Sequence, residues 1–352
     1  MLPFPELDGI EEIVIIGNYG SGNVGDEAML QVLVELISKR FSNVRIIVPS
    51  RQPINLGNFI FCKNFYPVNT IKGIYKALFS DVLILGPGTL FSKHAGGGIY
   101  VASLVAILRK AIGKKLYLYG IGYSSTTSFL LKILSRIIFK LSDEIYVRDR
   151  LSLEKIRHGV QTEHTLSHLS LVPEPALFLK AASSVPQCVK NIKNRKQGPL
   201  IGISLSYVPQ YADMIADSIA EFVTQLCYRY NVSVCFLTFH PMLVSRKIKS
   251  DTELGAAIKE QLPPKIRSNI FVLPYFPPDI TLRIIRELDF LVCMRYHSLV
   301  FAYKERKPFV AISFEDKQRS FLEEYGGESI DLENLTAKEL IQKFNYLYNV
   351  GP

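Results

Sequence analysis

Residues 17–30 read GNYGSGNVGDEAML and directly follow the apolar run at 13–16. Three glycines of this stretch match the pattern G-x-G-x-x-G, which follows a strand and opens a helix in dinucleotide-binding proteins. The helix N-terminus binds a pyrophosphate in such proteins, but here the acids Asp26 and Glu27 stand where the helix begins. The stretch therefore predicts a strand, a glycine-rich loop and a helix. It leaves open whether the loop binds a phosphate or a ligand that an acid can hold.

The end of the next expected strand bears on the dinucleotide alternative. In dinucleotide-binding folds an acid at this point binds a ribose hydroxyl. The strand expected at 44–48 is followed by Pro49, Ser50 and Arg51, none of which is acidic. Arg51 would suit the 2′-phosphate of NADP, so NADP binding stays as an alternative, while no cofactor is the expectation.

The composition is that of a globular protein of two domains. The chain has 352 residues, more than one typical core needs, with 48% hydrophobic and 21% charged residues. Its five cysteines form no CxxC pair, which favours a reducing compartment. Neither a secretory signal nor a membrane-spanning run is present, so we expect a cytoplasmic location. The closest histidine pair, His164 and His168, lacks the glutamate of an HExxH motif, and no metal is expected.

The chain is basic, with a net charge of +9. Such a charge suits nucleic acid, an anionic membrane surface or anionic small substrates, but no nucleic-acid-binding motif stands out. Residues 129–141 read FLLKILSRIIFKL, with Lys132, Arg136 and Lys140 on one helical stripe. This pattern occurs in helices that lie on anionic membranes, and more commonly in helices packed on a core with a solvated stripe. We expect no nucleic-acid partner and keep open a peripheral contact with the inner face of an anionic membrane.

Apolar, β-branched runs alternate with helical patterns along the chain. Strands are expected at 13–16, 44–48, 82–85, 116–119, 144–147, 200–205, 233–238, 269–273, 290–294 and 308–312. Helices are expected at 28–41, 100–112, 129–141, 214–230, 282–288, 298–305, 316–325 and 337–348. Continuous apolar strands that alternate with helices predict an α/β fold whose parallel sheets are covered on both faces.

One segment interrupts this alternation. Residues 181–198 are polar, basic and without periodicity, which predicts a linker. We therefore expect a Rossmann-like domain at 1–180, a second one at 199–330, and a helix with a tail at 331–352. Two such domains facing a cleft would bind a ligand at the carboxyl ends of their strands.

Polar or glycine-rich residues directly follow several of the expected strands. They are the loop at 17–26, GPGT at 86–89, GIG at 120–122, RDR at 148–150, His240, and RYH at 295–297. Because parallel strands end at one edge of a sheet, we expect these residues to line a ligand site.

Arg295 and His297 form the first candidate group. A histidine exchanges protons near neutral pH, and an arginine two residues earlier can bind a carboxylate or phosphate through two N–H groups. The alternative is that His297 only caps or fills the start of the next helix.

Arg148 and Lys317 are further candidate anion ligands. Arg148 follows a strand in the first half of the chain, with a local pairing to Asp149 as the alternative. Lys317 stands at the start of a helix, where it would add positive potential over the cleft or remain a solvated helix charge.

Taken together, these segments resemble the polysaccharide pyruvyl transferase family. The resemblance lies in GNYGSGNVGDEAML at 17–30, GPGTLF at 86–91, LYGIGYS at 118–124, YVRDRLSLEKIRHGV at 146–160 and LDFLVCMRYHSLVFAYKERKPFVAISFEDKQRSFLEEYG at 288–326. It extends over 13–326; the last segment is quite specific, and the ordered set of segments is much more so. Two positions depart from the family's pattern: Pro87 replaces a glycine, and PEPA at 173–176 replaces the more usual Asp-Pro-Ala. We expect neither to touch Arg148, His297 or Lys317, so that both bear on acceptor fit.

The resemblance implies a two-domain fold like that of GT-B glycosyltransferases and a transferase activity. Such an enzyme moves the enolpyruvyl unit of phosphoenolpyruvate onto two hydroxyls of a sugar in a cell-wall or exopolysaccharide precursor, which forms a pyruvate ketal and releases phosphate. Arg148, Arg295 and Lys317 would bind the phosphoenolpyruvate anion, and His297 would donate a proton to its methylene carbon. The acceptor, lipid- or nucleotide-linked, would be held by Gly22, Asn23, Asp26, Gly88 and His240.

Two other functions stay open. The first is a GT-B glycosyltransferase that uses a nucleotide sugar. The second is a non-catalytic sugar-binding relative that has kept the fold, because a fold alone does not determine a function.

Overall fold

The computed structural model describes residues 2–5, 7, 9–50, 70–92, 97–123, 128–160, 163–195, 198–241 and 250–350. The chain divides into two compact units. The first unit consists of Met1–Ser21 and Asp26–Leu179, and the second of Gly22–Gly25 and Lys180–Pro352. Four residues of the glycine-rich loop therefore belong to the second unit. Arg51 lies outside the described residues.

The first unit is built on a parallel sheet with the strand order β2-β1-β3-β5-β6-β7, and β4 pairs with β5 beside this path. Its strands are β1 (Glu12–Ile16), β2 (Arg45–Ile47), β3 (Val82–Leu85), β4 (Gly88–Phe91), β5 (Lys115–Tyr123), β6 (Glu144–Val147) and β7 (Leu169–Leu171). Every residue of β1 and β3 is buried, as expected for strands covered on both faces.

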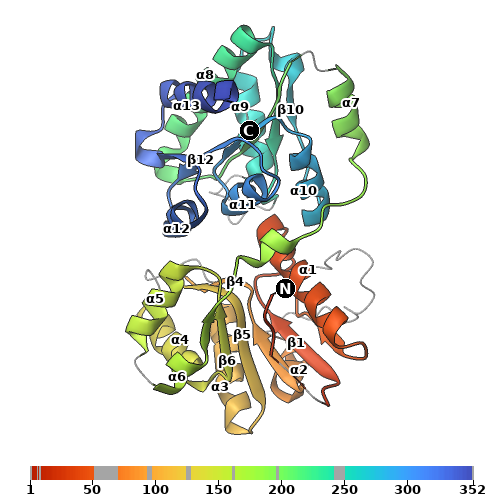
Figure 1. The fold of residues 1–352 in the computed structure, drawn as a ribbon, viewed down its shortest axis with the longest axis vertical. Coiled ribbons are helices and arrows are strands. Elements are labelled where there is room, and N and C mark those ends of the chain that lie inside the picture. The colour runs from red at the N-terminus through yellow and green to blue at the C-terminus, as the bar shows by residue number, and fades with distance from the viewer. Residues whose placement is uncertain are drawn as a thin grey trace. The chain divides into compact units, whose positions relative to one another are not determined.

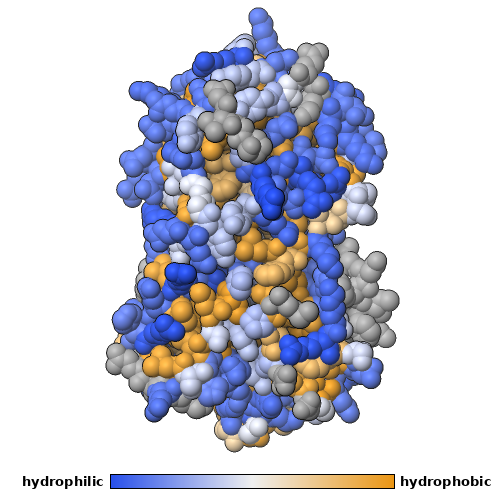
Figure 2. Space-filling view, in the orientation of Figure 1, coloured by the Kyte–Doolittle hydropathy of each residue, from blue (hydrophilic) through white to orange (hydrophobic). Residues whose placement is uncertain are grey.

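Helices cover both faces of this sheet (Figure 1). They are α1 (Val24–Arg40), α2 (Ile71–Phe79), α3 (Gly98–Ala111), α4 (Phe129–Leu141), α5 (Arg150–Gly159) and α6 (Glu163–Ser167). Alternate residues of β1 pack in different cores, because successive strand side chains point to opposite faces. Ile13 and Ile15 pack with α1, whereas Val14 and Ile16 share a core with α2, α3, α4 and α5. Figure 2 shows that hydrophobic side chains also reach the surface of this unit.

The second unit contains a parallel sheet with the strand order β10-β9-β8-β11-β12-β13. Its strands are β8 (Leu200–Ser204), β9 (Ser233–Leu237), β10 (Ile270–Val272), β11 (Phe290–Cys293), β12 (Phe309–Ser313) and β13 (Glu328–Asp331). Its helices are α7 (Gln187–Arg195), α8 (Ala212–Tyr230), α9 (Asp251–Gln261), α10 (Pro278–Arg286), α11 (Tyr296–Lys304), α12 (Asp316–Tyr325) and α13 (Ala337–Val350). The 3-10 helices are η1 (Pro175–Phe178), in the first unit, and η2 (Pro209–Tyr211), η3 (Arg267–Asn269) and η4 (Leu332–Asn334), in the second. Helices α8, α9 and α13 pack on one core with β8 and β11.

The predicted α/β class with parallel sheets is confirmed, and three local expectations are wrong. The segment GPGTLF contains β4 instead of only a turn, and β5 continues through the GIG segment, where buried Ile121 pairs with both β4 and β6. The expected linker at 181–198 contains α7, in which the side chains of Val189 and Ile192 are buried. The other residues of α7 are mostly polar, so the sequence shows only a weak apolar pattern of helical period at this segment. No helix among the described residues is long and apolar enough to span a bilayer.

Candidate functional site

Arg295 and His297 lie where β11 ends and α11 begins. Arg295 is the N-cap of α11, and its carbonyl accepts hydrogen bonds from the N–H (3.0 Å) and the hydroxyl (2.6 Å) of Ser298. Ser298 in turn accepts a hydrogen bond of 2.5 Å from Ser204, at the end of β8. These bonds fix the turn from strand to helix, so the arginine and the buried histidine have defined positions at the carboxyl edge of the sheet.

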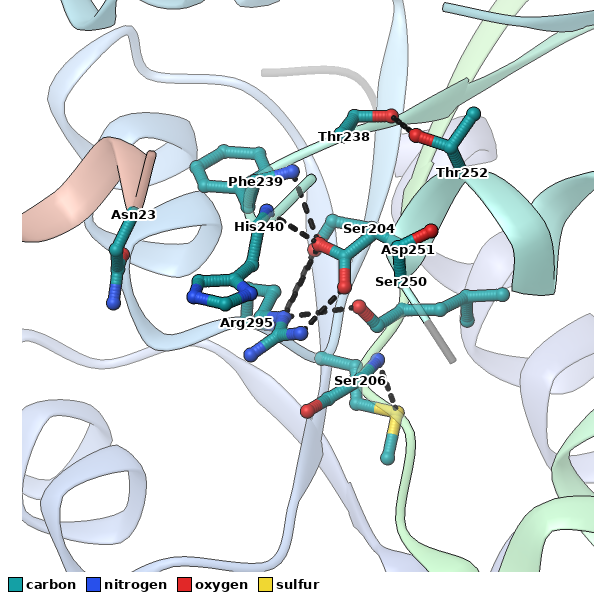
Figure 3. Close-up of polar contacts among 12 residues, drawn as sticks. Asn23, Ser204, Ser206, Thr238, Phe239, His240, Ser250, Asp251, Thr252 and Arg295 are labelled. Atoms are coloured by element: carbon teal, nitrogen blue, oxygen red, sulfur yellow. Dashed lines mark hydrogen bonds and ion pairs between the residues drawn. The ribbon is translucent and has the colours of Figure 1, made fainter. Parts of the chain in front are cut away.

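The guanidinium of Arg295 is held by the buried carboxylate of Asp251, the first residue of α9 (Figure 3). The same carboxylate accepts the backbone N–H groups of Phe239 (3.0 Å) and His240 (2.9 Å). Nε of Arg295 also donates to the carbonyl of Leu205 at 3.1 Å. Asp251 therefore ties the ends of β9 and β11 together, and it orients the one arginine of the RYH segment.

Sequence reasoning missed Asp251. Its helix, α9, begins with a capping box in which Ser250 and Glu253 cap each other's backbone N–H groups. The pattern Ser-x-x-Glu is a known start signal for a helix. That signal would have found α9, but not the pairing of Asp251 with an arginine far along the chain.

The glycine-rich loop supplies the segment Gly22–Gly25 to this region of the second unit. The N–H of Val24 donates to the carbonyl of Phe239 at 3.0 Å, and the side chain of Asn23 accepts the N–H of Gly25 at 3.1 Å. A Cβ atom on Gly22 would lie 2.9 Å from Cγ of Pro241. Figure 3 shows the side chain of Asn23 next to the imidazole of His240, beyond which Arg295 lies.

Gly25 lies directly against the imidazole of His297. A Cβ atom built on Gly25 would fall 1.7 Å from Nδ1 and 2.2 Å from Cγ of that ring. Since real Cβ atoms essentially never come within 3.0 Å of a neighbour, only glycine fits at this position. The glycine is needed here for the close approach of the backbone to a side chain.

Lys317, the second residue of α12, is linked to the histidine through Tyr296. Its Nζ lies 5.7 Å from the centroid of the Tyr296 ring, and that ring meets the ring of His297 edge-on at 4.9 Å. Nζ also forms an ion pair of 2.8 Å with Glu315. Lys317 is thus a half-buried and paired cation, not a freely solvated one. Gln318 beside it donates to the carbonyl of Met294 at 2.9 Å and holds α12 at the end of β11.

Arg148 lies in the first unit, at the end of β6, and is almost completely buried. It donates to the hydroxyl of Thr89 at 2.9 Å, and it forms ion pairs with Glu174 at 3.4 Å and Asp149 at 3.8 Å. The expectation that the PEPA departure does not touch Arg148 is therefore wrong. Glu174 caps η1 at the same sheet edge, and its carboxylate reaches the guanidinium. Glu174 of the PEPA segment, where the family more usually has an aspartate, therefore contacts Arg148 directly.

Asp26 and Gly88 also lie in the first unit. Asp26 accepts a hydrogen bond from Asn18 at 3.2 Å, and a Cβ atom on Gly88, whose φ is +125°, would lie 3.3 Å from the Asp26 carboxylate. Burial, together with the nearby charge of Asp26, raises the pKa of Tyr19 well above its ordinary value. Tyr19 remains a hydrogen-bond donor and binds the carbonyl of Gly86 at 2.6 Å. The carboxylate of Asp26 therefore lies against both the glycine-rich loop at 17–26, through Asn18, and the turn at 86–89, through Gly88.

The structure divides the predicted site residues between the units. The second unit holds Gly22, Asn23, His240, Arg295, His297 and Lys317, and the first holds Asp26, Gly88 and Arg148. Among the described residues there is no group of three or more His, Cys, Asp or Glu that could hold a metal ion.

Comparisons with known proteins agree with this architecture. The model of a family described as polysaccharide pyruvyl transferase matches residues 23–316. No curated protein sequence gives a significant match.

Several solved structures share the fold. The UDP-GlcNAc 2-epimerase from Methanocaldococcus jannaschii has a TM-score of 0.64 at 11% identity, over 97% of this chain and 93% of its own. A putative UDP-N-acetylglucosamine 2-epimerase from Listeria monocytogenes has a TM-score of 0.64 at 9% identity, over 96% and 88%. The E. coli ADP-heptose LPS heptosyltransferase II has a TM-score of 0.54 at 16% identity, over 97% and 99%. These neighbours are of the GT-B type, so the GT-B-like α/β fold is confirmed, and at such identities the likeness shows the fold alone.

Proposed function

Since this chain belongs to the polysaccharide pyruvyl transferase family, we propose that it transfers the enolpyruvyl unit of phosphoenolpyruvate to two hydroxyls of a sugar. The reaction forms a pyruvate ketal and releases phosphate. The observation that carries the proposal is the arrangement around α11, where a buried histidine, an oriented arginine and a half-buried lysine lie at one sheet edge.

The anionic co-substrate would bind at the N-terminus of α11. Backbone N–H groups and the helix dipole favour an anion there. Nε and Nη2 of Arg295 donate hydrogen bonds to Asp251, while Nη1 forms no hydrogen bond to a described residue. The Arg295 side chain is 28% exposed, and we propose that this nitrogen binds a carboxylate or phosphate. Lys317 would add a second positive charge beyond Tyr296.

His297 would act as the general acid. A proton delivered to the methylene carbon makes the adjacent carbon electrophilic, and a sugar hydroxyl forms a C–O bond to it. That hydroxyl gives up its proton as its C–O bond forms. The C–O bond to phosphate then breaks and phosphate leaves, and a second sugar hydroxyl adds to the same carbon and releases its own proton. The cations would offset the charge of the leaving phosphate. The backbone at Gly25 packs directly against the imidazole, which supports this role.

Each unit offers candidate ligands for the acceptor sugar. Asn23 and His240 offer an amide and an imidazole in the second unit. Asp26 offers a carboxylate in the first unit, beside Gly88, where the backbone can approach a sugar closely. A carboxylate suits sugar hydroxyls, which donate hydrogen bonds, and disfavours the pyrophosphate of a dinucleotide.

Arg148 is proposed as a further ligand of the co-substrate. Only 4% of this residue is exposed, and Glu174 already offsets its charge. An Arg148→Lys variant separates two roles. If Arg148 binds phosphoenolpyruvate directly, the variant should have a higher KM for phosphoenolpyruvate. If Arg148 is purely structural, the variant should have a lower free energy of unfolding and an unchanged KM.

The experiment is phosphate release from phosphoenolpyruvate with a panel of nucleotide- and lipid-linked sugars. With the acceptor that reacts, His297→Ala should lower kcat by about a hundredfold or more, the usual contribution of a general acid. His158→Ala, an exposed histidine at the end of α5, is the matched control and should leave kcat unchanged. Near-normal ketal formation by His297→Ala would contradict the assignment.

The likeness to nucleotide-sugar enzymes favours one second candidate, a GT-B glycosyltransferase. In that case the same panel would give nucleotide release that does not depend on phosphoenolpyruvate. Stoichiometric sugar binding with no released phosphate or nucleotide would instead support a non-catalytic relative.

A further inference from the structure

Three neighbouring helices of the first unit expose apolar side chains on their outer sides. Helix α2 packs against α3, and α3 against α4. On each helix most of the exposed residues recur every fourth position, at 71/75/79, 104/108 and 129/133/137, which places them on one stripe; Leu130 adjoins Phe129, and Ile112 caps the end of α3. We name these ten residues the helical apolar face: Ile71, Tyr75, Phe79, Leu104, Leu108, Ile112, Phe129, Leu130, Ile133 and Ile137.

The exposure of this face does not reflect loosely packed helices. Each helix buries a second stripe in the core of the first unit, with Ala77 on α2, Val105 on α3 and Phe139 on α4. On the outer side, by contrast, Ile71 is 88% exposed and Phe129 is 81% exposed. Single exposed apolar residues are ordinary, but ten of them on three neighbouring helices are typical of an interaction surface.

The charges on these helices have one sign. Helices α2, α3 and α4 contain no aspartate or glutamate. The exposed cations Lys132, Arg136 and Lys140 run along α4 next to Ile133 and Ile137. The basic and apolar stripes of α4 therefore lie side by side at the surface, opposite the stripe that the helix buries in the core.

We propose that the helical apolar face docks on the surface of a bilayer that contains anionic phospholipid. Apolar side chains can enter the boundary between headgroups and acyl chains, while lysine and arginine bind the phosphates. A second copy of this chain fits the surface poorly, because self-association would bring the cations of α4 close to those of its partner. The proposal is independent of the reaction, although a lipid-linked acceptor would be presented at this surface.

The experiment is co-sedimentation of the full chain with vesicles of phosphatidylcholine alone and of phosphatidylcholine with phosphatidylglycerol. The charge variant is Lys132→Glu/Arg136→Glu/Lys140→Glu. Its control, Lys190→Glu/Lys265→Glu/Lys338→Glu, changes the net charge equally at exposed positions of the second unit. The apolar variant is Ile71→Ser/Leu104→Ser/Phe129→Ser, and its control is Tyr228→Ser/Tyr346→Ser/Tyr348→Ser, again exposed in the second unit.

The unchanged chain should bind the anionic vesicles more tightly than the neutral ones. One cation near an anionic surface contributes about fivefold in partitioning, and each glutamate of the charge variant is also repelled, so this variant should bind at least about a hundredfold more weakly. The apolar variant should lose binding to both kinds of vesicle, and both controls should bind like the unchanged chain.

Three results would overturn the proposal. The first is no vesicle binding by the unchanged chain. The second is an equal loss in the variants and their controls, which would reflect net charge or general hydrophobicity alone. The third is a dimer in solution that the apolar variant dissociates, with no vesicle binding, which would assign the face to a second copy.

Discussion

The contact between Gly25 and His297 makes a prediction that can be tested before any substrate is known. In Gly25→Ala the new Cβ would start 1.7 Å from Nδ1 of the imidazole and must reach at least 3.0 Å. Either the ring or the segment Gly22–Gly25 therefore has to move by about 1 Å or more. The segment is held by the hydrogen bond from Val24 to Phe239, so we expect the imidazole to be displaced.

The structure sets the size of two effects. Overpacking of a well-filled site lowers the free energy of unfolding by about 1–3 kcal/mol. A displacement of about 1 Å at a catalytic group lowers kcat by about a hundredfold. Gly25→Ala should therefore lose most of its activity while it remains folded at room temperature.

The assay is urea unfolding of four chains: unchanged, Gly25→Ala, His297→Ala and the double variant. If the imidazole is the clashing group, its removal creates room for the new methyl group. The Gly25→Ala change should then lower the free energy of unfolding by less than about 0.5 kcal/mol in the His297→Ala background, a coupling typical of contacting residues. Gly159→Ala, with nothing within 4 Å of its Cβ position, is the control. An equal loss in both backgrounds would refute the reasoning.

Three further predictions concern carboxylates. Asp251→Asn should lower the free energy of unfolding by about 3 kcal/mol in urea, because Arg295 loses its buried partner. Glu174→Gln should do the same to a similar extent through Arg148. The backbone N–H of Glu11, followed by other contacts, lowers the pKa of Asp81 below its ordinary value. The contribution of Asp81 to the free energy of unfolding is therefore complete above its pKa in the unfolded chain, and it is lost as the pH falls through its lower pKa in the folded protein. Asp81→Asn should therefore make the free energy of unfolding depend less on pH in the acidic range.

An exposed ion pair provides the control for these carboxylate variants. Glu260 pairs with Arg267 at the surface, and Glu260→Gln should change the free energy of unfolding by less than about 1 kcal/mol. If Asp251→Asn or Glu174→Gln behaved like this control, the buried pairs would not stabilise their strand ends. If the free energy of unfolding of Asp81→Asn fell with acid as steeply as that of the unchanged chain, the hydrogen bonds to Asp81 would not be the cause of the acid sensitivity.

The sequence predicted the elements that have strong local signals. Helices α4 and α12 begin and end at the predicted residues because Ser128 and Glu315 cap them and their apolar spacing is regular. Helix α9 was missed because Gly255 interrupts its pattern. A Cβ atom there would lie 2.9 Å from Phe236, so the glycine serves tertiary packing at the expense of helical propensity.

The candidate site was predicted in part. The histidine and arginine of the RYH segment could be identified because they directly follow an apolar strand. The partners Asp251 and Glu174 could not, because each pairing joins distant parts of the chain and leaves no periodic signal. The assignment of Gly22–Gly25 to the second unit was equally hidden, since a strand–loop–helix motif normally belongs to a single domain.

The position of Gly22–Gly25 has a consequence for biosynthesis. The ribosome makes this tetrapeptide near the beginning of the chain, but its partners Phe239 and His297 follow only in the C-terminal half. The first unit can fold as it emerges, as N-terminal domains do, whereas the second lacks one of its segments if it is expressed from Lys180 onward. A gene split at the boundary between Leu179 and Lys180 would therefore not yield two self-sufficient halves, because the second would leave the imidazole of His297 without the backbone that covers it.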